Sequence, residues 1–288
     1  MPNHRLTRRD FLALAGAAPL LTPAARELGR AQTASRKQIP LGLEIYTLRA
    51  EEEKDRMGTL KAIKEMGYDG VEFYGPYFQW TDEYAKQVRK HMDSLGLRCF
   101  STHTARANFS TQDLPRAAQL NQILGSRHVV MAHSVSVEGG EDGWKRLAAD
   151  LTRAHETLKP LGLSAGFHNW PTEFKPEGTF RPIDVLLANT PKDFGFQIDT
   201  GGVFPNGVDL AAFTKANPGR IRSFHLKDWA PGQKGLLIGE GTAPWKAIFE
   251  AAETVGGVEY YLIEQEGSRF TPMETAKMSV ENYRRIRA

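Results

Sequence analysis

The sequence is poor in cysteine, with Cys99 as the single thiol in 288 residues. One thiol excludes an intramolecular disulfide and any metal site built from several cysteines. Cys99 lies in an apolar run, so we expect it to behave as a small buried hydrophobic side chain. Hydrophobic residues make up 41% of the chain and charged residues 25%, which excludes a disordered or collagen-like protein.

The sequence also lacks a long hydrophobic run near its start. The apolar stretch from Phe11 to Leu21 has about 11 residues, whereas a membrane-spanning helix needs about 20. The paired arginines Arg8 and Arg9 precede this stretch, and small residues follow it. A charged start, a short apolar middle and a small-residue end are typical of a secretory signal. The arginine pair resembles the twin-arginine (Tat) type, which carries folded proteins.

We therefore predict a signal peptide over residues 1–34, export through the Tat machinery, and a periplasmic or secreted protein without a stable membrane anchor. The chain's formal charge of +3 belongs to this segment. Residues 1–34 hold five arginines and two acids, so the remaining chain has 32 basic and 32 acidic residues. A neutral mature domain gives no reason to expect a nucleic-acid partner.

No glycine-rich phosphate fingerprint follows the first strand, which argues against a dinucleotide-binding sheet. Instead, a short apolar run, a polar turn and a helical pattern repeat eight times from residue 40. The runs predict strands near Leu41–Thr47, Gly70–Tyr74, Leu97–His103, His128–His133, Leu163–His168, Phe194–Asp199, Ile221–Lys227 and Tyr260–Glu264. Strict alternation predicts a parallel sheet, and eight units in about 250 residues predict one closed (β/α)8 TIM barrel over residues 40–288.

Chemistry in this architecture belongs to the carboxyl ends of the strands. Polar residues at or near those ends are His103, His133, His168 and His225, with the acids Glu72, Asp199 and Glu264. An acid inside an apolar run is costly unless it is paired or bound to a cation. One Asp, one Glu and one or two His on one rim would suit a divalent ion, with Mn²⁺, Co²⁺, Zn²⁺ and Mg²⁺ all compatible. His225 and Lys227 share a strand face and are expected to point into the barrel mouth.

At this point the sequence resembles the sugar phosphate isomerase/epimerase family, whose members have a xylose isomerase-like TIM barrel. The resemblance covers roughly residues 40–288. The stretches that carry it are 42–49, 67–72, His168-Asn169, 197–201, 225–228, 239–241 with Trp245, and 263–265. Each stretch is short, and their order and placement at strand ends make the resemblance specific.

The resemblance implies one divalent metal ion held by Asp199, His225 and Glu264. Many epimerases have a Glu at the fifth strand, where this chain has His168, with Glu173 five residues later. Either His168 or Glu173 would complete the site, and the symmetric two-glutamate mechanism is in doubt. Glu264, with Glu173 or His168, would move the proton. Lys227, His103, Glu72 and Trp170 are predicted to contact the substrate, Lys227 also as a catalytic group.

These expectations predict a metal-dependent isomerase or epimerase that acts on a sugar or keto-sugar through an enediolate. An exported protein meets few sugar phosphates, which favours an unphosphorylated carbohydrate. Two alternatives stay open: a lyase or hydratase acting on a 3-keto-glycoside with the same metal site, and a non-catalytic carbohydrate-binding barrel. The sequence leaves the oligomeric state open.

Overall fold

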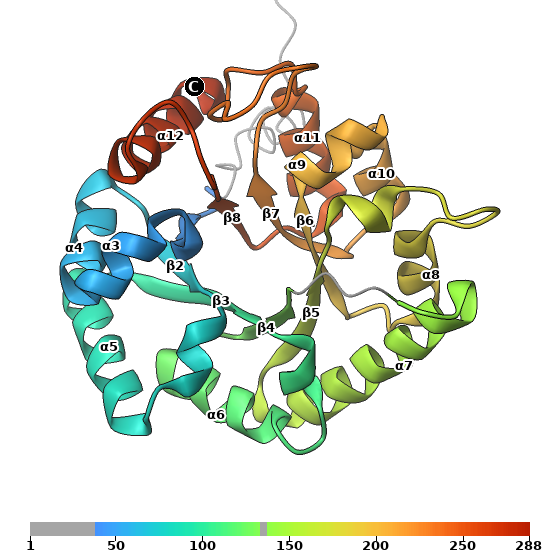
Figure 1. Ribbon diagram of the computed structural model, residues 1–288, viewed down its shortest axis with the longest axis horizontal. Helices are drawn as coiled ribbons and strands as arrows, with labels where there is room; N and C mark the ends of the chain where they lie inside the picture. Colours follow the sequence, from blue (N-terminus) through green and yellow to red (C-terminus); the bar gives the residue numbers. More distant parts are fainter. Residues whose placement is uncertain (1–37, 133–136) are drawn as a thin grey trace, which may run out of the picture. The chain divides into compact units, whose positions relative to one another are not determined.

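The computed structural model describes residues 38–132 and 137–288, so the predicted signal segment and His133 lie outside the described residues. Eight parallel strands close into one barrel in sequence order, with β1 hydrogen-bonded to both β2 and β8 (Figure 1). Helices surround this barrel on its outer side (Figure 1). The prediction of a single (β/α)8 barrel is therefore confirmed. No helix in the described part of the chain is long and apolar enough to cross a membrane.

The strands fall where the apolar runs predicted them, although most are shorter. They are β1 Leu41–Glu44, β2 Gly70–Phe73, β3 Arg98–Thr104, β4 His128–Met131, β5 Ser164–His168, β6 Gly195–Asp199, β7 Ile221–Leu226 and β8 Tyr260–Ile263. The α-helices are α3 Arg49–Lys54, α4 Arg56–Met66, α5 Asp82–Leu95, α6 Leu114–Leu124, α7 Gly140–Leu158, α8 Pro182–Asn189, α9 Thr200–Val203, α10 Leu210–Ala216, α11 Trp245–Ala251 and α12 Pro272–Arg287. Short turns of helix are η2 Ile45–Leu48, η3 Gly75–Gln79, η4 Arg106–Phe109, η5 Lys159–Leu161, η6 Pro171–Phe174, η7 Phe204–Asn206 and the π-helical η8 Ala252–Gly256.

Glycine ends several of the outer helices, as the sequence pattern predicts. Gly67 after α4 has φ 95° and Gly125 after α6 has φ 75°. Both values lie in the left-handed region, where a residue with a Cβ is strained. Each helix therefore stops at its glycine, and the chain turns back toward the amino end of the next strand.

Two bulges set which side chains of β3 and β7 point into the barrel. The register between β2 and β3 shifts beside Phe100, and the register between β6 and β7 shifts beside Arg222. A bulge adds one residue to a strand and changes its alternation. As a result Phe100 and the adjacent Ser101 both face the interior: Phe100 packs on β8, and Ser101 bonds to a side chain of β2.

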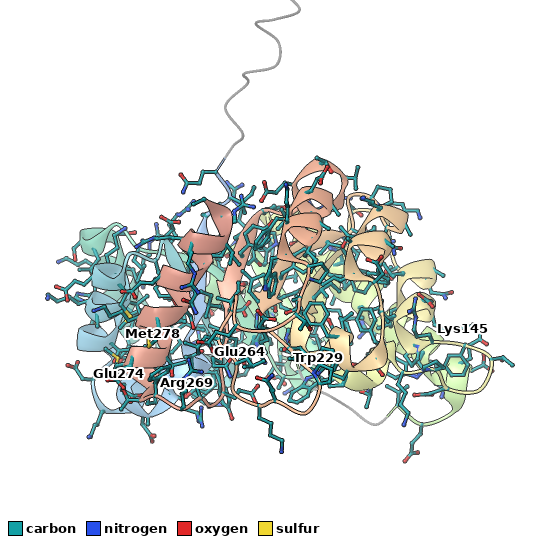
Figure 2. The ribbon with its side chains drawn as sticks, turned by 90° about the horizontal axis from the view of Figure 1, so that it is seen from above. Lys145, Trp229, Glu264, Arg269, Glu274 and Met278 are labelled. Carbon is teal, nitrogen blue, oxygen red and sulfur yellow. The ribbon has the colours of Figure 1, made fainter. Side chains whose placement is uncertain are left out.

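A small apolar cluster fills the interior near the amino ends of the strands. Phe100 stacks on Tyr260 with ring centroids 5.1 Å apart, and Leu262 joins them. Gly42 and Gly70 leave room for the Phe100 ring, since a Cβ at either position would lie within 3.0 Å of it. This plug, formed by Phe100, Tyr260 and Leu262, closes one end of the barrel. Polar side chains fill the interior above it, and in the side view of Figure 2 Glu264 and Trp229 lie toward the same edge of the molecule.

Candidate active site

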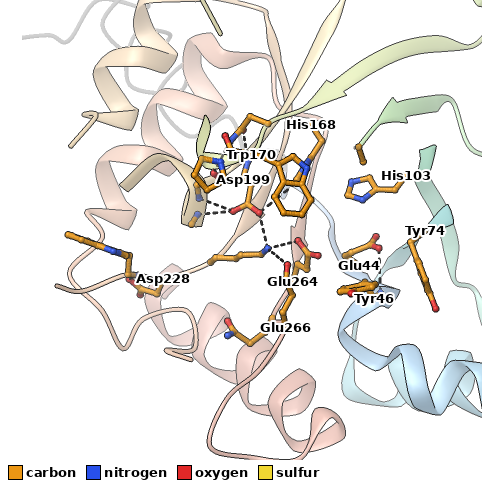
Figure 3. A pocket seen from close by; sticks show the side chains of 18 of the residues that line it. Glu44, Tyr46, Tyr74, His103, His168, Trp170, Asp199, Asp228, Glu264 and Glu266 are labelled. Atoms are coloured by element: carbon orange, nitrogen blue, oxygen red, sulfur yellow. Dashed lines mark hydrogen bonds and ion pairs between the residues drawn. The ribbon is translucent and has the colours of Figure 1, made fainter. Parts of the chain in front are cut away.

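A cavity of about 620 Å³ opens at the carboxyl ends of the strands. Its inner part is lined by polar side chains of β1, β3 and β5 to β8 and of the residues just after them (Figure 3). These side chains are Glu44, His103, His168, Asp199, Lys227 and Glu264. A concave site with a few convergent polar groups is the usual form of a ligand site.

Four side chains from neighbouring strands converge at the inner end of this cavity: His168, Asp199 and Glu264 line it, and His225 lies buried directly behind them. The donor atoms of His168, Asp199, His225 and Glu264 all lie within 4.8 Å of one another. All four side chains are buried. The structure thus brings together four of the five residues predicted as metal ligands, and the group is called the quartet below.

Asp199 is held by the start of the next helix. Its Oδ1 accepts hydrogen bonds from the backbone N–H groups of Gly201 at 2.8 Å and Gly202 at 3.3 Å, which caps α9. The backbone N–H of Asp199 donates to Oδ1 of Asn169 at 2.9 Å. The cap occupies one carboxylate oxygen and leaves Oδ2 directed toward the quartet.

His168 ends β5 without a hydrogen-bond partner for either ring nitrogen. Its Nε2 lies 3.7 Å from Oδ2 of Asp199, too far for a hydrogen bond. Burial lowers the pKa of His168 to about 4, so the imidazole is neutral at pH 7. A neutral, buried and unpartnered imidazole is the form that binds a metal ion.

Lys227 follows β7 and places its ammonium between two acids of the quartet. Its Nζ lies 2.8 Å from Oδ2 of Asp199 and 2.8 Å from Oε2 of Glu264. Burial raises the pKa of both carboxyl groups, but the lysine charge outweighs it and holds each pKa well below the usual range. Both carboxylates are therefore ionised and already attract a cation.

His225 lies between two carboxylates. Its Nδ1 is 2.8 Å from Oε2 of Glu264, and its Nε2 is 2.7 Å from Oε1 of Glu72. Burial lowers the pKa of His225, but the two carboxylates outweigh it and raise the pKa to about 9. The ring position is thus fixed from both sides.

Glu72 lies beneath the cavity, fully buried, and does not line it. Besides His225 it accepts hydrogen bonds from the hydroxyl of Ser101 and from Nε2 of Gln197 at 2.8 Å, and it pairs with Nε2 of His103 at 2.9 Å. Burial raises the pKa of Glu72, but His103 and His225 outweigh it and hold that pKa well below the usual range. The sequence predicts that Glu72 contacts the substrate. The structure instead places Glu72 behind His103, which lines the cavity, and behind His225, which adjoins it.

Glu173 does not lie with the quartet. It is buried in η6, where its Oε2 accepts a hydrogen bond from the backbone N–H of Trp170 at 2.6 Å. Burial raises its pKa. Trp170 itself lines the cavity, as does His103. Of the two residues predicted at the β5 position, the structure brings His168 to the site and uses Glu173 to hold the backbone of Trp170.

Sequence reasoning missed Glu44 and Gln197. Glu44 ends β1 and lines the cavity, and its Oε2 has no hydrogen-bond partner. Burial and the charges of Glu72 and Glu264 raise its pKa well above the usual value. The sequence contains a signal that could have identified Glu44. Glu44 is an acid inside the apolar run Leu41–Ile45, and the same pattern identified Glu72.

The residues present fit a divalent metal ion. Two imidazoles and two carboxylates make a donor set that suits borderline divalent ions. The unpartnered nitrogens of His168 give an independent indication, since buried polar atoms normally have partners. The second carboxylate behind His225 matches the arrangement that usually orients a metal-binding histidine.

Comparisons with known proteins agree with this architecture. The chain is 24% identical to a sugar phosphate isomerase/epimerase from Parabacteroides distasonis, with 86% of this chain and 94% of that chain covered and a TM-score of 0.71. It is 10% identical to the probable 3-DHS dehydratase from Bacillus anthracis, with coverage of 85% and 99% and a TM-score of 0.69. It is 14% identical to the IolI protein, solved with a bound zinc atom, with coverage of 86% and 98% and a TM-score of 0.64.

At these identities the solved structures show a shared fold. Among curated proteins no relative matches the chain. The sequence profile described as xylose isomerase-like TIM barrel matches residues 60–286, which is most of the chain. The protein belongs to the xylose isomerase-like TIM barrel family.

Proposed function

We propose that this protein is a metal-dependent enzyme that isomerises or epimerises a sugar or keto-sugar. The observation that carries the proposal is the quartet, buried at the inner end of a cavity large enough for a sugar. His168, Asp199, His225 and Glu264 would hold one divalent ion. Such an ion supplies Lewis acidity, which makes the C–H group beside a carbonyl more acidic.

The protein's own groups supply the proton transfer. Glu264 is ionised and lines the cavity, so it is the candidate base for the proton beside the carbonyl. Lys227 carries its charge on the same side of the cavity and would donate a hydrogen bond to a substrate oxygen that becomes negative. Return of the proton to another carbon or to the other face completes isomerisation or epimerisation.

The proposal is tested first by the metal requirement. Asp199→Asn removes one charge from the quartet but keeps an oxygen for the α9 cap. We expect this variant to lose bound metal and turnover together. Asp209→Asn is the matched control, because Asp209 caps α10 in the same way. Full metal occupancy in Asp199→Asn, measured by elemental analysis of the purified protein, would overturn the assignment.

A second candidate is elimination from the same intermediate. Two observations favour it: Glu173 bonds to Trp170 N–H instead of facing Glu264 across the cavity, and burial with the charges of Glu72 and Glu264 raises the pKa of the Glu44 carboxyl group well above its usual value. A carboxyl group with a raised pKa beside one base suits general-acid assistance to the loss of a neighbouring oxygen group. Product mass separates the two reactions, since isomerisation leaves the substrate mass unchanged and elimination splits the substrate.

The third candidate is carbohydrate binding without catalysis. The discriminating measurement is solvent exchange, with the metal-loaded protein, D₂O and a panel of sugars and keto-sugars. Incorporation of deuterium beside the carbonyl supports an enzyme. Binding without any exchange across the panel would support a binding barrel.

A further inference from the structure

The cavity has two chemically different halves. Its inner half is lined by Glu44, Lys227 and three members of the quartet, with His225 behind them, while its mouth is lined by Tyr46, Tyr74, Trp170, Trp229 and Leu236. In Figure 3 the Trp170 ring comes from the β5 side, and Tyr46 and Tyr74 come from the opposite side, with Glu264 and Glu44 between them. The mouth thus offers apolar ring faces where the inner half offers charges and hydrogen bonds.

Two of these rings are unusually exposed. Tyr46 is 36% exposed and Trp170 is 41% exposed, and they belong to a group of four exposed large hydrophobic residues among the described residues. The other two, Leu161 and Val255, lie in η5 and η8, the segments that lead into strands at the opposite end of the barrel. Exposed aromatic rings gathered at the entrance of a polar cavity indicate a binding surface.

The Tyr46 ring and the Trp170 backbone are held in place before any ligand binds. Tyr46 contacts Tyr74 edge to face at 5.3 Å, and the guanidinium of Arg49 lies 4.6 Å from its ring centroid. The backbone of Trp170 is fixed by its hydrogen bond to Glu173. A surface that is already ordered loses little conformational entropy on binding.

The described lining carries little positive charge. It contains one lysine and no arginine against five carboxyl groups. The lysine, Lys227, is already engaged by Asp199, Glu264 and Glu266. Away from the ion that the quartet would hold and from the engaged Lys227, a phosphate group would find no cation in this lining and would meet several carboxylates. This lining therefore favours a ligand without a phosphate group.

The cavity is also larger than one sugar ring requires. A hexose has about 12 heavy atoms, and at a water molecule's share of about 30 Å³ each they would occupy at most about 360 Å³. The cavity measures about 620 Å³, so a second ring can bind beside the first.

We propose that the substrate is a neutral glycoside whose reacting sugar ring carries its own keto group and occupies the inner half, and whose linked second ring stacks on Trp170 and Tyr46. This inference rests on the proposed function for the reacting ring. The second ring can be another sugar or an aromatic aglycone, because both have an apolar face that can stack on an aromatic side chain.

The test compares affinities of the metal-loaded protein for matched ligands by calorimetry. The panel contains glucose, galactose and mannose, the phenyl glycoside and a disaccharide of each, and the 6-phosphate of each. We expect at least one glycoside to bind about tenfold tighter than its free sugar, because stacked rings add affinity of that order. The phenyl and disaccharide arms identify the kind of second ring.

Substitutions at Trp170 test whether the higher affinity for glycosides comes from the aromatic mouth. In Trp170→Ala the ratio of glycoside affinity to free-sugar affinity should fall to about one, and Trp170→Phe should restore part of it. Leu161→Ala, an exposed hydrophobic residue at the other end of the barrel, is the matched control and should leave the ratio unchanged. Equal affinity for free sugars and glycosides, tightest binding of a phosphate, or no binding by any member would overturn the inference.

The deuterium-exchange assay separates this inference from the proposed function. Glycoside preference that depends on Trp170, without exchange, supports the two-ring site and contradicts the enzyme. Exchange into a free sugar, without any glycoside preference, supports the enzyme and contradicts the two-ring site.

Discussion

Glu72 illustrates how a carboxylate can serve a site that it does not line. It has no contact with solvent, yet it accepts hydrogen bonds from Ser101 and Gln197 and pairs with two histidines. Its contact with Nε2 of His225 orients the ring so that Nδ1 faces Glu264. Glu72 is therefore a positioning residue for the quartet.

We predict that Glu72→Gln weakens metal binding about 10- to 100-fold, because loss of an orienting carboxylate typically has an effect of that size. Competition with a chromophoric chelator measures the affinity without depending on turnover. Glu52→Gln is the matched control, since Glu52 is also buried but pairs with Arg56 away from the cavity. Unchanged metal affinity in Glu72→Gln, in a variant with wild-type melting temperature, would contradict the positioning role.

A second prediction for single residues concerns the proton that His225 would release when a metal ion binds. The pKa of His225 is raised to about 9, so the metal-free protein holds this imidazole protonated at pH 7, whereas a metal ion binds the neutral ring. Metal binding at pH 7 should release about one proton, and affinity should rise roughly tenfold per pH unit between pH 6 and 8. Calorimetry in buffers of different ionisation enthalpy measures the release. An observed enthalpy that does not vary with the buffer would refute it.

The residues of the quartet could be predicted from the sequence because each is polar at the end of an apolar run. The same argument could not separate His168 from Glu173, which lie five residues apart. The choice depends on η6, which turns the Glu173 carboxylate back to the N–H of Trp170. Local capping of this kind depends on backbone conformation that residue spacing does not specify.

At the scale of elements, the eight strands and the shared face of His225 and Lys227 could be predicted, but the interior facing of both Phe100 and Ser101 on β3 could not be read from alternation alone. The bulges beside Phe100 and Arg222 shift that alternation within each strand. Where a strand has no such shift, alternation is reliable: Gln197 and Asp199 on β6 both face the interior.

The loop from β7 to α11 depends on one side chain. Asp228 accepts hydrogen bonds from the backbone N–H groups of Trp229 at 2.8 Å and Gly239 at 2.6 Å, and from Nε1 of Trp245 at 2.9 Å. This aspartate joins the start of the loop, its middle and the helix that follows. It also lines the cavity near Trp229.

We predict that Asp228→Ala lowers the free energy of unfolding by about 2–3 kcal/mol, because several buried donors lose their acceptor. Urea denaturation followed by tryptophan fluorescence measures the change. Asp142→Ala, at an exposed position in the first turn of α7, is the control and should stay within about 0.5 kcal/mol of wild type. A similarly small effect of Asp228→Ala would show that the loop does not depend on this side chain.

At the scale of the whole molecule, the barrel is complete within residues 39–288, since β1 pairs with β8 and closes the sheet. The arginine pair at Arg8 and Arg9 is therefore expected to act on export alone. Replacing both with lysine keeps the charge and removes the twin-arginine signal. Fractionation of cells should find the variant in the cytoplasm with the wild-type melting temperature. Equal export of the two proteins would contradict a Tat signal.

The plug of Phe100, Tyr260 and Leu262 determines the order in which a metal ion and a sugar could enter and leave the barrel. With the barrel filled at that end, an ion and a sugar would reach the interior by the same entrance, and the quartet lies deeper than the aromatic mouth. A metal ion held by the quartet would therefore enter first and leave last, and a bound sugar would block its departure. The proposed enzyme would then keep its ion longest while substrate is abundant.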